Sequence, residues 1–206
     1  EIRVLSRHSR LPKFKCPGGI DSSHIMNARL SPEHKQVFRN VLDDFKESDT
    51  GNLYMVQMPP DGMVDYVHAK AAQYNRLNPI DLIIIDSINL LRLSGKIEGK
   101  RIMLEDMLQN FKRFASSFDG GRGVAIVSPW QMSRNAWYEA KESGGTYTMA
   151  SLSDTSEAEK SSSQIISIFK EDNDNADGRL NIQVLKNRSG REMSKVSYPY
   201  DYRNRS

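Results

Sequence analysis

The chain has 206 residues, and 29 Lys and Arg against 26 Asp and Glu give it a formal net charge of +3. This length suffices for one large core, so a single domain over residues 1–206 is the expected organisation. The single cysteine, Cys16, excludes an internal disulfide, and four scattered histidines lack zinc-ligand spacing. No apolar run approaches the roughly 18 residues of a membrane span. We therefore expect a soluble protein of the reducing cytoplasm, whose slight basic excess permits a polyanionic partner.

The first part of the chain predicts helices separated by a loop and a short strand. Residues 1–11 have a helical pattern that looks like the middle of an element, so we expect the chain to be incomplete at this end. Ser31-Pro32 is a helix start, with the cap at Ser31 and proline at the first helical position. Residues 53–56 predict a short strand, and Asp61 is expected to cap a helix that continues to Asn78.

The run from Asp81 to Asp86 is apolar and β-branched between its two carboxylates. Such a run is typical of a parallel strand covered by helices on both faces. Asp86 then lies at the carboxyl edge of the sheet, where ligands bind in open α/β folds, and a carboxylate there is suited to Mg²⁺ beside nucleotide phosphates. The alternative is that Asp86 caps a following helix.

The remaining chain predicts a second strand, helix, strand crossover followed by hairpins. The pattern indicates a loop over 91–101, a helix over 102–118 stopped by Asp119-Gly120-Gly121, and a buried strand over 124–127. Residues 139–163, rich in Ser, Thr, Gly and Glu, indicate a long surface loop. Three short antiparallel strands are expected to extend the sheet, over 164–169, 181–185 and 193–198.

Four motifs recur in the order known for one family. They are Asn27-Ala-Arg-Leu-Ser31 before an amphipathic helix, Asp81-Leu-Ile-Ile-Ile-Asp86, Gln131-Met132-Ser133-Arg134 and Lys186-x-Arg188-x-Gly190. Together they resemble the C-terminal domain of DnaB-type replicative helicases over roughly residues 22–197. The resemblance implies an α/β fold: a RecA-like three-layer core of parallel strands with helices on both faces, extended by antiparallel C-terminal hairpins.

The resemblance also assigns roles to residues at the strand ends. Asp86 occupies the Walker B position, which holds Mg²⁺ on ATP. Gln131 occupies the place of the γ-phosphate sensor, and the alternative is a glutamine that bonds the loop backbone. Lys186 and Arg188 look like the finger residues that enter the neighbouring subunit's nucleotide site, where positive charge stabilises phosphoryl transfer. The alternative for this pair is an exposed basic hairpin.

Single-stranded DNA is the polymer partner that the resemblance implies. The candidate contacts follow the Gln131 strand and continue into the next loop: Arg134, Ser153, Thr155 and Ser156. This loop departs from the family, because the sequence after Ser153-Asp154 is acidic and lacks the usual arginine and glycine. Trp137 and Tyr138 are candidates for stacking on bases, and the favoured alternative for Trp130 and Trp137 is a core or subunit-interface role.

The phosphate-binding motif G-x-x-x-x-G-K-[ST] is absent from these 206 residues. In the family this loop and its helix precede a strand that ends in a catalytic glutamate. Glu1 matches that point, which makes it the candidate base that activates water, with an ordinary solvated glutamate as the alternative.

The resulting hypothesis is a motor domain of a ring-forming, ATP-driven DNA helicase, translocating 5′ to 3′ as a homo-oligomer, expected to be a hexamer. Its expected cofactors are ATP and Mg²⁺, and its expected partners are single-stranded DNA, a primase and a helicase loader of bacterial or phage replication. This chain alone is expected to be inactive. Two alternatives remain: a non-hydrolysing RecA-like scaffold or loader, and a RecA-like recombinase or clock-type ATPase.

Overall fold

A computed structural model describes residues 2–47, 51–94, 99–152, 156–170 and 178–200. It divides the chain into two compact units, residues 1–56 with 201–206 and residues 57–200. The interpretation of residues 1–206 as one motor domain stays a prediction. Among the described residues, no helix is long and apolar enough to cross a membrane.

The first unit is helical. Its elements are α1 (Ile2–His8), η1 (Pro12–Phe14), α2 (Ser22–Met26) and α3 (Pro32–Glu47). The predicted start of α3 is confirmed, because the Ser31 hydroxyl accepts a hydrogen bond from the main-chain N–H of His34 at 3.1 Å. Asp44 of α3 binds Lys13 and His8, and these two partners, Lys13 first, lower the pKa of the Asp44 carboxyl.

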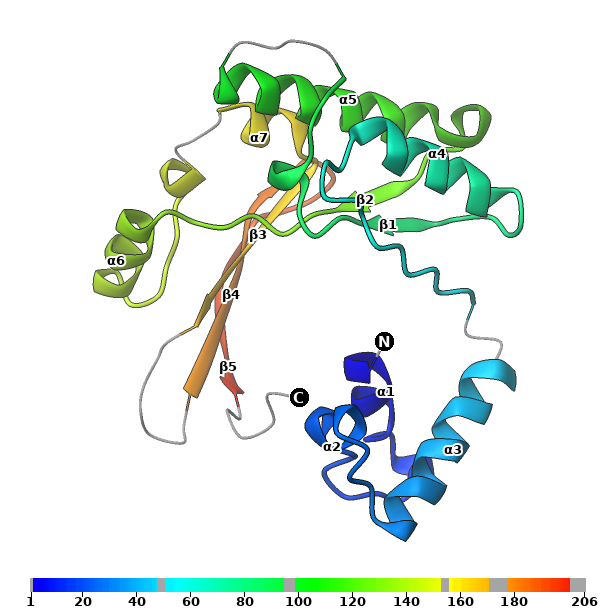
Figure 1. Ribbon diagram of the computed structural model, residues 1–206. Helices are drawn as coiled ribbons and strands as arrows, with labels where there is room; N and C mark the ends of the chain where they lie inside the picture. Colours follow the sequence, from blue (N-terminus) through cyan, green and yellow to red (C-terminus); the bar gives the residue numbers. More distant parts are fainter. Residues whose placement is uncertain (1, 48–50, 95–98, 153–155, 171–177, 201–206) are drawn as a thin grey trace. The chain divides into compact units, whose positions relative to one another are not determined.

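The second unit contains a two-stranded parallel sheet, a three-stranded antiparallel sheet and the helices around them (Figure 1). In chain order its elements are α4 (Val64–Asn75), β1 (Leu82–Ile84), η2 (Ile88–Leu90), α5 (Lys100–Gly121), β2 (Ala125–Val127), α6 (Arg134–Glu142), η3 (Met149–Leu152), α7 (Ser156–Ser161), β3 (Gln164–Lys170), β4 (Gly178–Asn187) and β5 (Met193–Tyr200).

The β1–α5–β2 crossover predicted from the sequence is confirmed. The two strands are parallel, with Ile83 opposite Ile126. Helix α5 loses its helical backbone at Phe118, and positive φ angles at Asp119 and Gly120 reverse the chain toward β2.

One main hydrophobic core lies between the parallel sheet and the helices α4 and α5. Its buried members come from both helices, from the end of β1 and from η2: Val64, Val67, Ile85, Ile88, Leu91, Leu104, Met107 and Phe111. In Figure 1 both helices lie on the same side of β1 and β2. Their apolar stripes explain why a strand, helix, strand pattern folds into this layer.

The other face of the parallel sheet differs from the sequence-based expectation. The apolar run of β1 predicts burial on both faces, but Leu82 is 50% exposed, Ile84 67% and Val127 53%. The reason is that α4 and α5 cover a single face, toward which Ile83 and Ile126 point. Alternate residues of a strand point to opposite faces. Leu82, Ile84 and Val127 therefore point to the face that no described helix covers.

Two local predictions between residues 53 and 64 are wrong. Residues 53–56 form no strand, because they have no partner strand among the described residues, and strand pairing cannot be read from a local pattern. The helix after them starts at Val64 rather than beside Asp61. Gly62 and Val64 instead exchange main-chain hydrogen bonds with Arg92, each of 2.9 Å, which keeps this segment extended.

The C-terminal hairpins are confirmed, since β3, β4 and β5 pair antiparallel in that order. They form a sheet of their own, not hydrogen-bonded to β1 or β2, so the expected extension of the parallel sheet is wrong for the described strands. The predicted loop over 139–163 is also wrong in part, because it contains the end of α6 as well as η3 and α7. A helix cap at Ser133, which accepts a hydrogen bond from Ala136 N–H, starts α6.

Candidate nucleotide-binding edge

The carboxyl ends of β1 and β2 lie at the same edge of the parallel sheet. Ile84 is opposite Val127, so Asp86 and Gln131 both follow neighbouring strand ends. The main-chain N–H of Ile88 donates to the Ser128 hydroxyl at 3.0 Å and joins the two segments beyond the strands. This is the edge where parallel α/β sheets bind ligands.

Asp86 is exposed at this edge, directly after the buried Ile85. Ile85 is held by a main-chain hydrogen bond to Val127 of 2.9 Å, so the position of the carboxylate is set by the sheet. Asp86 makes no hydrogen bond or ion pair with any residue that the structure describes. The capping alternative is wrong, because η2 is preceded by Ser87 and has no side-chain cap. The bond between Asp86 and Ser87 is a cis peptide.

Gln131 lies on the exposed segment between β2 and α6. Its amide makes no hydrogen bond to the loop backbone within the described chain, so the backbone-bonding alternative is not observed. The preceding Trp130 packs against the main core, which fixes the segment and leaves the Gln131 amide in solvent. An exposed amide can donate to one ligand oxygen while an exposed carboxylate that follows the neighbouring strand binds a cation.

Lys186 and Arg188 lie at and just beyond the end of β4, in the antiparallel sheet. They therefore do not follow a strand of the parallel sheet after which Asp86 and Gln131 lie. Lys186 Nζ donates to the main-chain carbonyl of Glu159, and the Arg188 guanidinium donates to that of Lys160. The pair is thus bound to the C-terminal end of α7 and is not a free basic hairpin.

The aromatic residues after Gln131 belong mainly to a second small core. Trp137 of α6 stacks on Phe169 of β3, with ring centroids 6.2 Å apart, and Lys141 lies over the Trp137 ring. Tyr147 is buried in the same cluster, and burial raises the pKa of its hydroxyl. The core alternative for Trp130 and Trp137 is therefore confirmed.

The predicted DNA contacts are only partly described. Arg134 is the first residue of α6 and is exposed. Ser153 and Thr155 lie outside the described residues, as does Glu1, the candidate base, and Ser156 is the first residue of α7. Their roles remain predictions.

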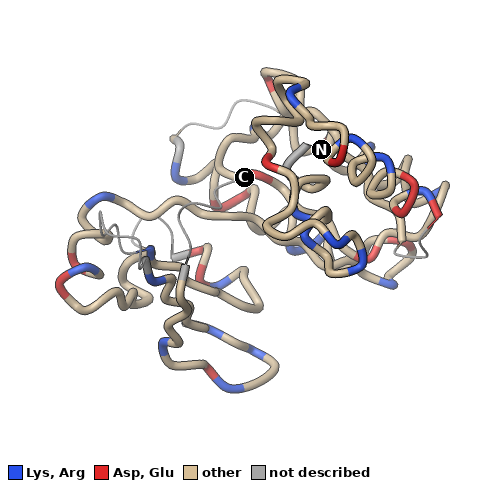
Figure 2. Tube along the Cα trace, turned by 90° about the horizontal axis from the view of Figure 1, so that it is seen from below, with Lys and Arg blue, Asp and Glu red and all other residues tan. Residues whose placement is uncertain are grey.

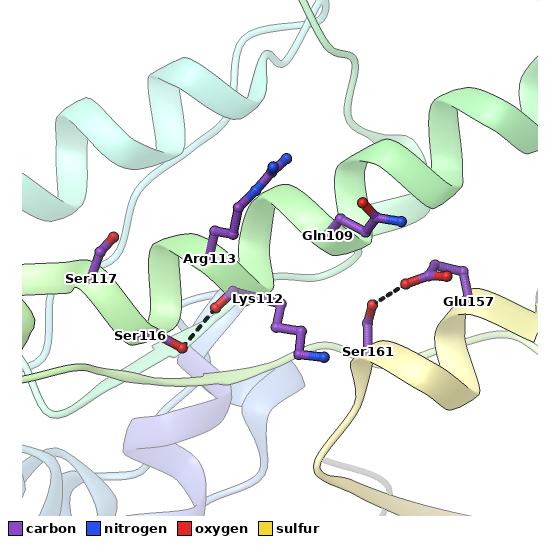
Figure 3. Close-up of a pocket in the computed structure, with 7 residues that line it drawn as sticks. All are labelled: Gln109, Lys112, Arg113, Ser116, Ser117, Glu157 and Ser161. Carbon is purple, nitrogen blue, oxygen red and sulfur yellow. Dashed lines mark hydrogen bonds between the residues drawn. The ribbon is translucent and has the colours of Figure 1, made fainter.

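An open pocket of about 680 Å³ lies between α5 and α7 (Figure 3). The residues that line it have polar or charged side chains: Gln109, Lys112, Arg113, Ser116, Ser117, Glu157 and Ser161. Neither Asp86 nor Gln131 lines it, so it is distinct from the carboxyl edge of the parallel sheet. Figure 2 shows basic and acidic residues interspersed along the trace, so charge alone does not mark either location as a polyanion site.

A divalent cation fits this edge only when it is coordinated jointly by the protein and by a phosphate-containing ligand. No group of three or more His, Cys, Asp or Glu side chains that could hold a metal occurs in the described part of the chain. Asp86 supplies one exposed carboxylate, which suits Mg²⁺ because this ion is usually bound by one or two carboxylates together with water and phosphate oxygens. The edge therefore fits a magnesium nucleotide better than a free metal.

Sequence reasoning found Asp86 and Gln131 but missed Ser128. Its hydroxyl is the acceptor that connects the two strand ends, at 40 residues from its donor in the sequence. The available signal was a serine directly after a buried strand and before a proline.

Comparison with known proteins identifies the family. The family model described as the DnaB-like helicase C terminal domain matches residues 11–203. A search of curated proteins gives no match. Among solved structures, the chain is similar to an ATPase domain with a TM-score of 0.72 and 18% identity, covering 95% of this chain and 65% of that one.

A second similar structure is that of a DnaB-like replicative helicase and its interactions with primase. Its TM-score is 0.69 at 18% identity, with 95% of this chain and 46% of that chain covered. The chain thus spans less than two thirds of the solved structures that it matches. These matches confirm the RecA-like α/β fold expected from the resemblance. The chain belongs to the family of DnaB-like helicase C-terminal domains.

Proposed function

We propose that the chain is most of the ATPase motor domain of a replicative DNA helicase, coupling ATP hydrolysis between subunits to movement along single-stranded DNA. The observation that supports this most directly is the pair of exposed side chains, Asp86 and Gln131, behind neighbouring parallel strands. Family membership supports the same activity. The direction, 5′ to 3′, and a hexameric ring follow from the family resemblance.

Each residue of the edge has a proposed task. When bound, a magnesium nucleotide supplies the phosphoryl group that is transferred to water. Asp86 orients the cation through its carboxylate, and the Gln131 amide donates to the terminal phosphate, which distinguishes ATP from ADP. Glu1 is proposed to accept the proton of the attacking water.

The second half of the site is proposed to come from other subunits and other parts of the protein. Lys186 and Arg188 of a neighbouring subunit would place positive charge beside the phosphates, which lowers the barrier to phosphoryl transfer. These 206 residues lack the phosphate-binding loop motif, so this chain alone is proposed to be inactive.

Single-stranded DNA is the proposed polymer, contacted by Arg134, Ser153, Thr155 and Ser156. A similar structure is of a helicase with its primase interactions, which supports a primase as a partner, and a loader is proposed from the family resemblance. The proposed location is the cytoplasm of a bacterium or of a cell infected by a phage.

Asp86→Asn in the full-length protein tests this function. DNA-stimulated ATP hydrolysis is expected to fall by roughly 100-fold, because the amide cannot hold the cation as the carboxylate does. Asp81→Asn is the matched control, since Asp81 lies at the other end of the same strand, is 89% exposed in its side chain and only pairs with Arg122. Equal turnover in both variants would contradict the proposal. A full-length protein that never hydrolyses ATP would instead support a non-hydrolysing scaffold or loader.

A further inference from the structure

The two cations near the end of β4 hold the C-terminal end of α7. Lys186 donates to the carbonyl of Glu159 and Arg188 to that of Lys160, both in the last turn of the helix. Such carbonyls have no partner within the helix, and positive charge complements their partial negative charge. The main-chain N–H of Arg188 also donates to the Ser163 carbonyl at 3.0 Å. The end of β4 therefore fixes the place where α7 ends.

Helix α7 has little stability of its own. It has six residues, and isolated helices shorter than about 12 residues are marginal in water. On its other side it packs against α5, with Ala158 only 7% exposed. Figure 3 shows Glu157 and Ser161, joined by a hydrogen bond of 2.5 Å, beside the polar side chains of α5. The position of α7 thus depends on α5 and on the two cations.

The place of α7 in the sequence gives this contact a functional meaning. The helix begins at Ser156, directly after Ser153 and Thr155, the proposed DNA contacts. Ser156, itself a proposed DNA contact, is the first residue of α7, so release of the C-terminal end of this helix affects the element that carries it.

We infer that Lys186 and Arg188 are positioning residues that anchor α7, and that a nucleotide in the neighbouring subunit competes with α7 for them. This inference rests on the proposed function, in which the same pair faces the neighbour's phosphates. The ammonium and guanidinium tips that bind the α7 carbonyls are the groups that would bind a phosphate. A phosphate that draws them away leaves carbonyls in the last turn of α7 without these partners, which couples the stability of α7 to the nucleotide state.

Hydrogen exchange of the α7 amides in the full-length protein, with ADP or with a non-hydrolysable ATP analogue, tests the inference. We expect α7 to exchange roughly tenfold faster with the analogue, which corresponds to the loss of about one charge-assisted hydrogen bond. In Lys186→Met with Arg188→Met, exchange is expected to be fast in both nucleotide states. Arg188→Lys, which keeps a cation, should restore part of the slow exchange with ADP.

Lys195→Met is the matched control. Lys195 also lies on the antiparallel sheet and donates to a main-chain carbonyl at 2.7 Å, but that carbonyl belongs to Gly144, after α6, and not to α7. Exchange of α7 in this variant should equal that of the wild type. Slow exchange in the double variant would overturn the anchoring, and equal exchange with both nucleotides in the wild type would overturn the competition.

The same samples separate this inference from the proposed function. If the wild-type protein hydrolyses ATP but the α7 amides exchange at the same rate with both nucleotides, the coupling is overturned and the proposed motor function is retained. If the protein never hydrolyses ATP, yet the double variant loses α7 protection, the motor function is overturned and the anchoring is supported.

Discussion

The main-chain N–H of Ile88 donates to the hydroxyl of Ser128 at 3.0 Å and joins the segments that follow two parallel strands. Asp86 precedes this connection on one segment and Gln131 follows it on the other. This connection fixes the segments that carry the Asp86 carboxylate, the proposed cation ligand, and the Gln131 amide, the proposed hydrogen-bond donor to phosphate. Misplacement of such groups by about 1 Å can lower the rate by a large factor. Ser128 is therefore a positioning residue for the proposed site.

Ser128→Ala is expected to lower DNA-stimulated ATP turnover by roughly tenfold and the free energy of unfolding by about 1 kcal/mol, since the Ile88 N–H loses its partner. Steady-state kinetics and urea denaturation of the full-length protein measure both effects. Ser116→Ala is the control, because the Ser116 hydroxyl is exposed and donates to the Lys112 carbonyl of its own helix. If the two variants turned over ATP at the same rate, Ser128 would have no positioning role.

Phe111 is expected to be a main source of stability of the second unit. It is 3% exposed, at the centre of the core between α4, α5 and the sheet. Phe111→Ala should lower the free energy of unfolding by about 3–5 kcal/mol through lost burial and a residual cavity. Ile102→Ala on the same helix, at a position that is 54% exposed, should cost less than about 0.5 kcal/mol. Similar denaturation midpoints for both variants would show that this core is not formed.

His68 is expected to make the protein less stable in mild acid. Its ring stacks on Phe114 with centroids 3.8 Å apart, and burial lowers its pKa below the ordinary 6.5, partly opposed by Asp65. The unfolded chain therefore binds a proton at a higher pH than the folded chain does. Stability is complete above about pH 6.5 and is lost as the pH falls through that value toward the lowered pKa.

Thermal unfolding at pH 7.5 and 5.5 measures this effect. The melting temperature of the wild type should fall more than that of His68→Phe, which cannot be protonated. His24→Gln replaces an exposed histidine and should keep the wild-type pH dependence. An identical fall in the wild type and in His68→Phe would rule out a contribution from His68.

The sequence predicted the elements whose signals are local. The β1–α5–β2 crossover follows from a β-branched run, an amphipathic stripe and a glycine stop, and these place Asp86 at the sheet edge. Pairing partners were not predictable in the same way. Within the described parts of the chain, residues 53–56 have strand composition but no partner strand, and β3 to β5 pair only with one another.

The missed helix α7 has the same physical origin, but the missed helix α6 does not. Helix α7 is polar and short, so its local pattern is that of a loop, and it is stabilised by Lys186 and Arg188, more than 25 residues away in the sequence. Helix α6 has a local signal, the cap at Ser133, but this serine lies within a polar segment whose pattern is that of a loop. The contacts of Lys186 and Arg188 with α7 form only in the assembled fold, so a local sequence pattern cannot predict them.

The most direct test of the central claim, that Asp86 holds the cation of a magnesium nucleotide, is the Mg²⁺ dependence of nucleotide binding by the full-length protein. Calorimetry with a non-hydrolysable ATP analogue, with Mg²⁺ or with EDTA, gives the gain in affinity that the cation provides. This gain is expected to be roughly tenfold or more in the wild type and in Gln131→Ala, and to be largely lost in Asp86→Asn. An Asp86→Asn protein that retained the full Mg²⁺ dependence would contradict the claim.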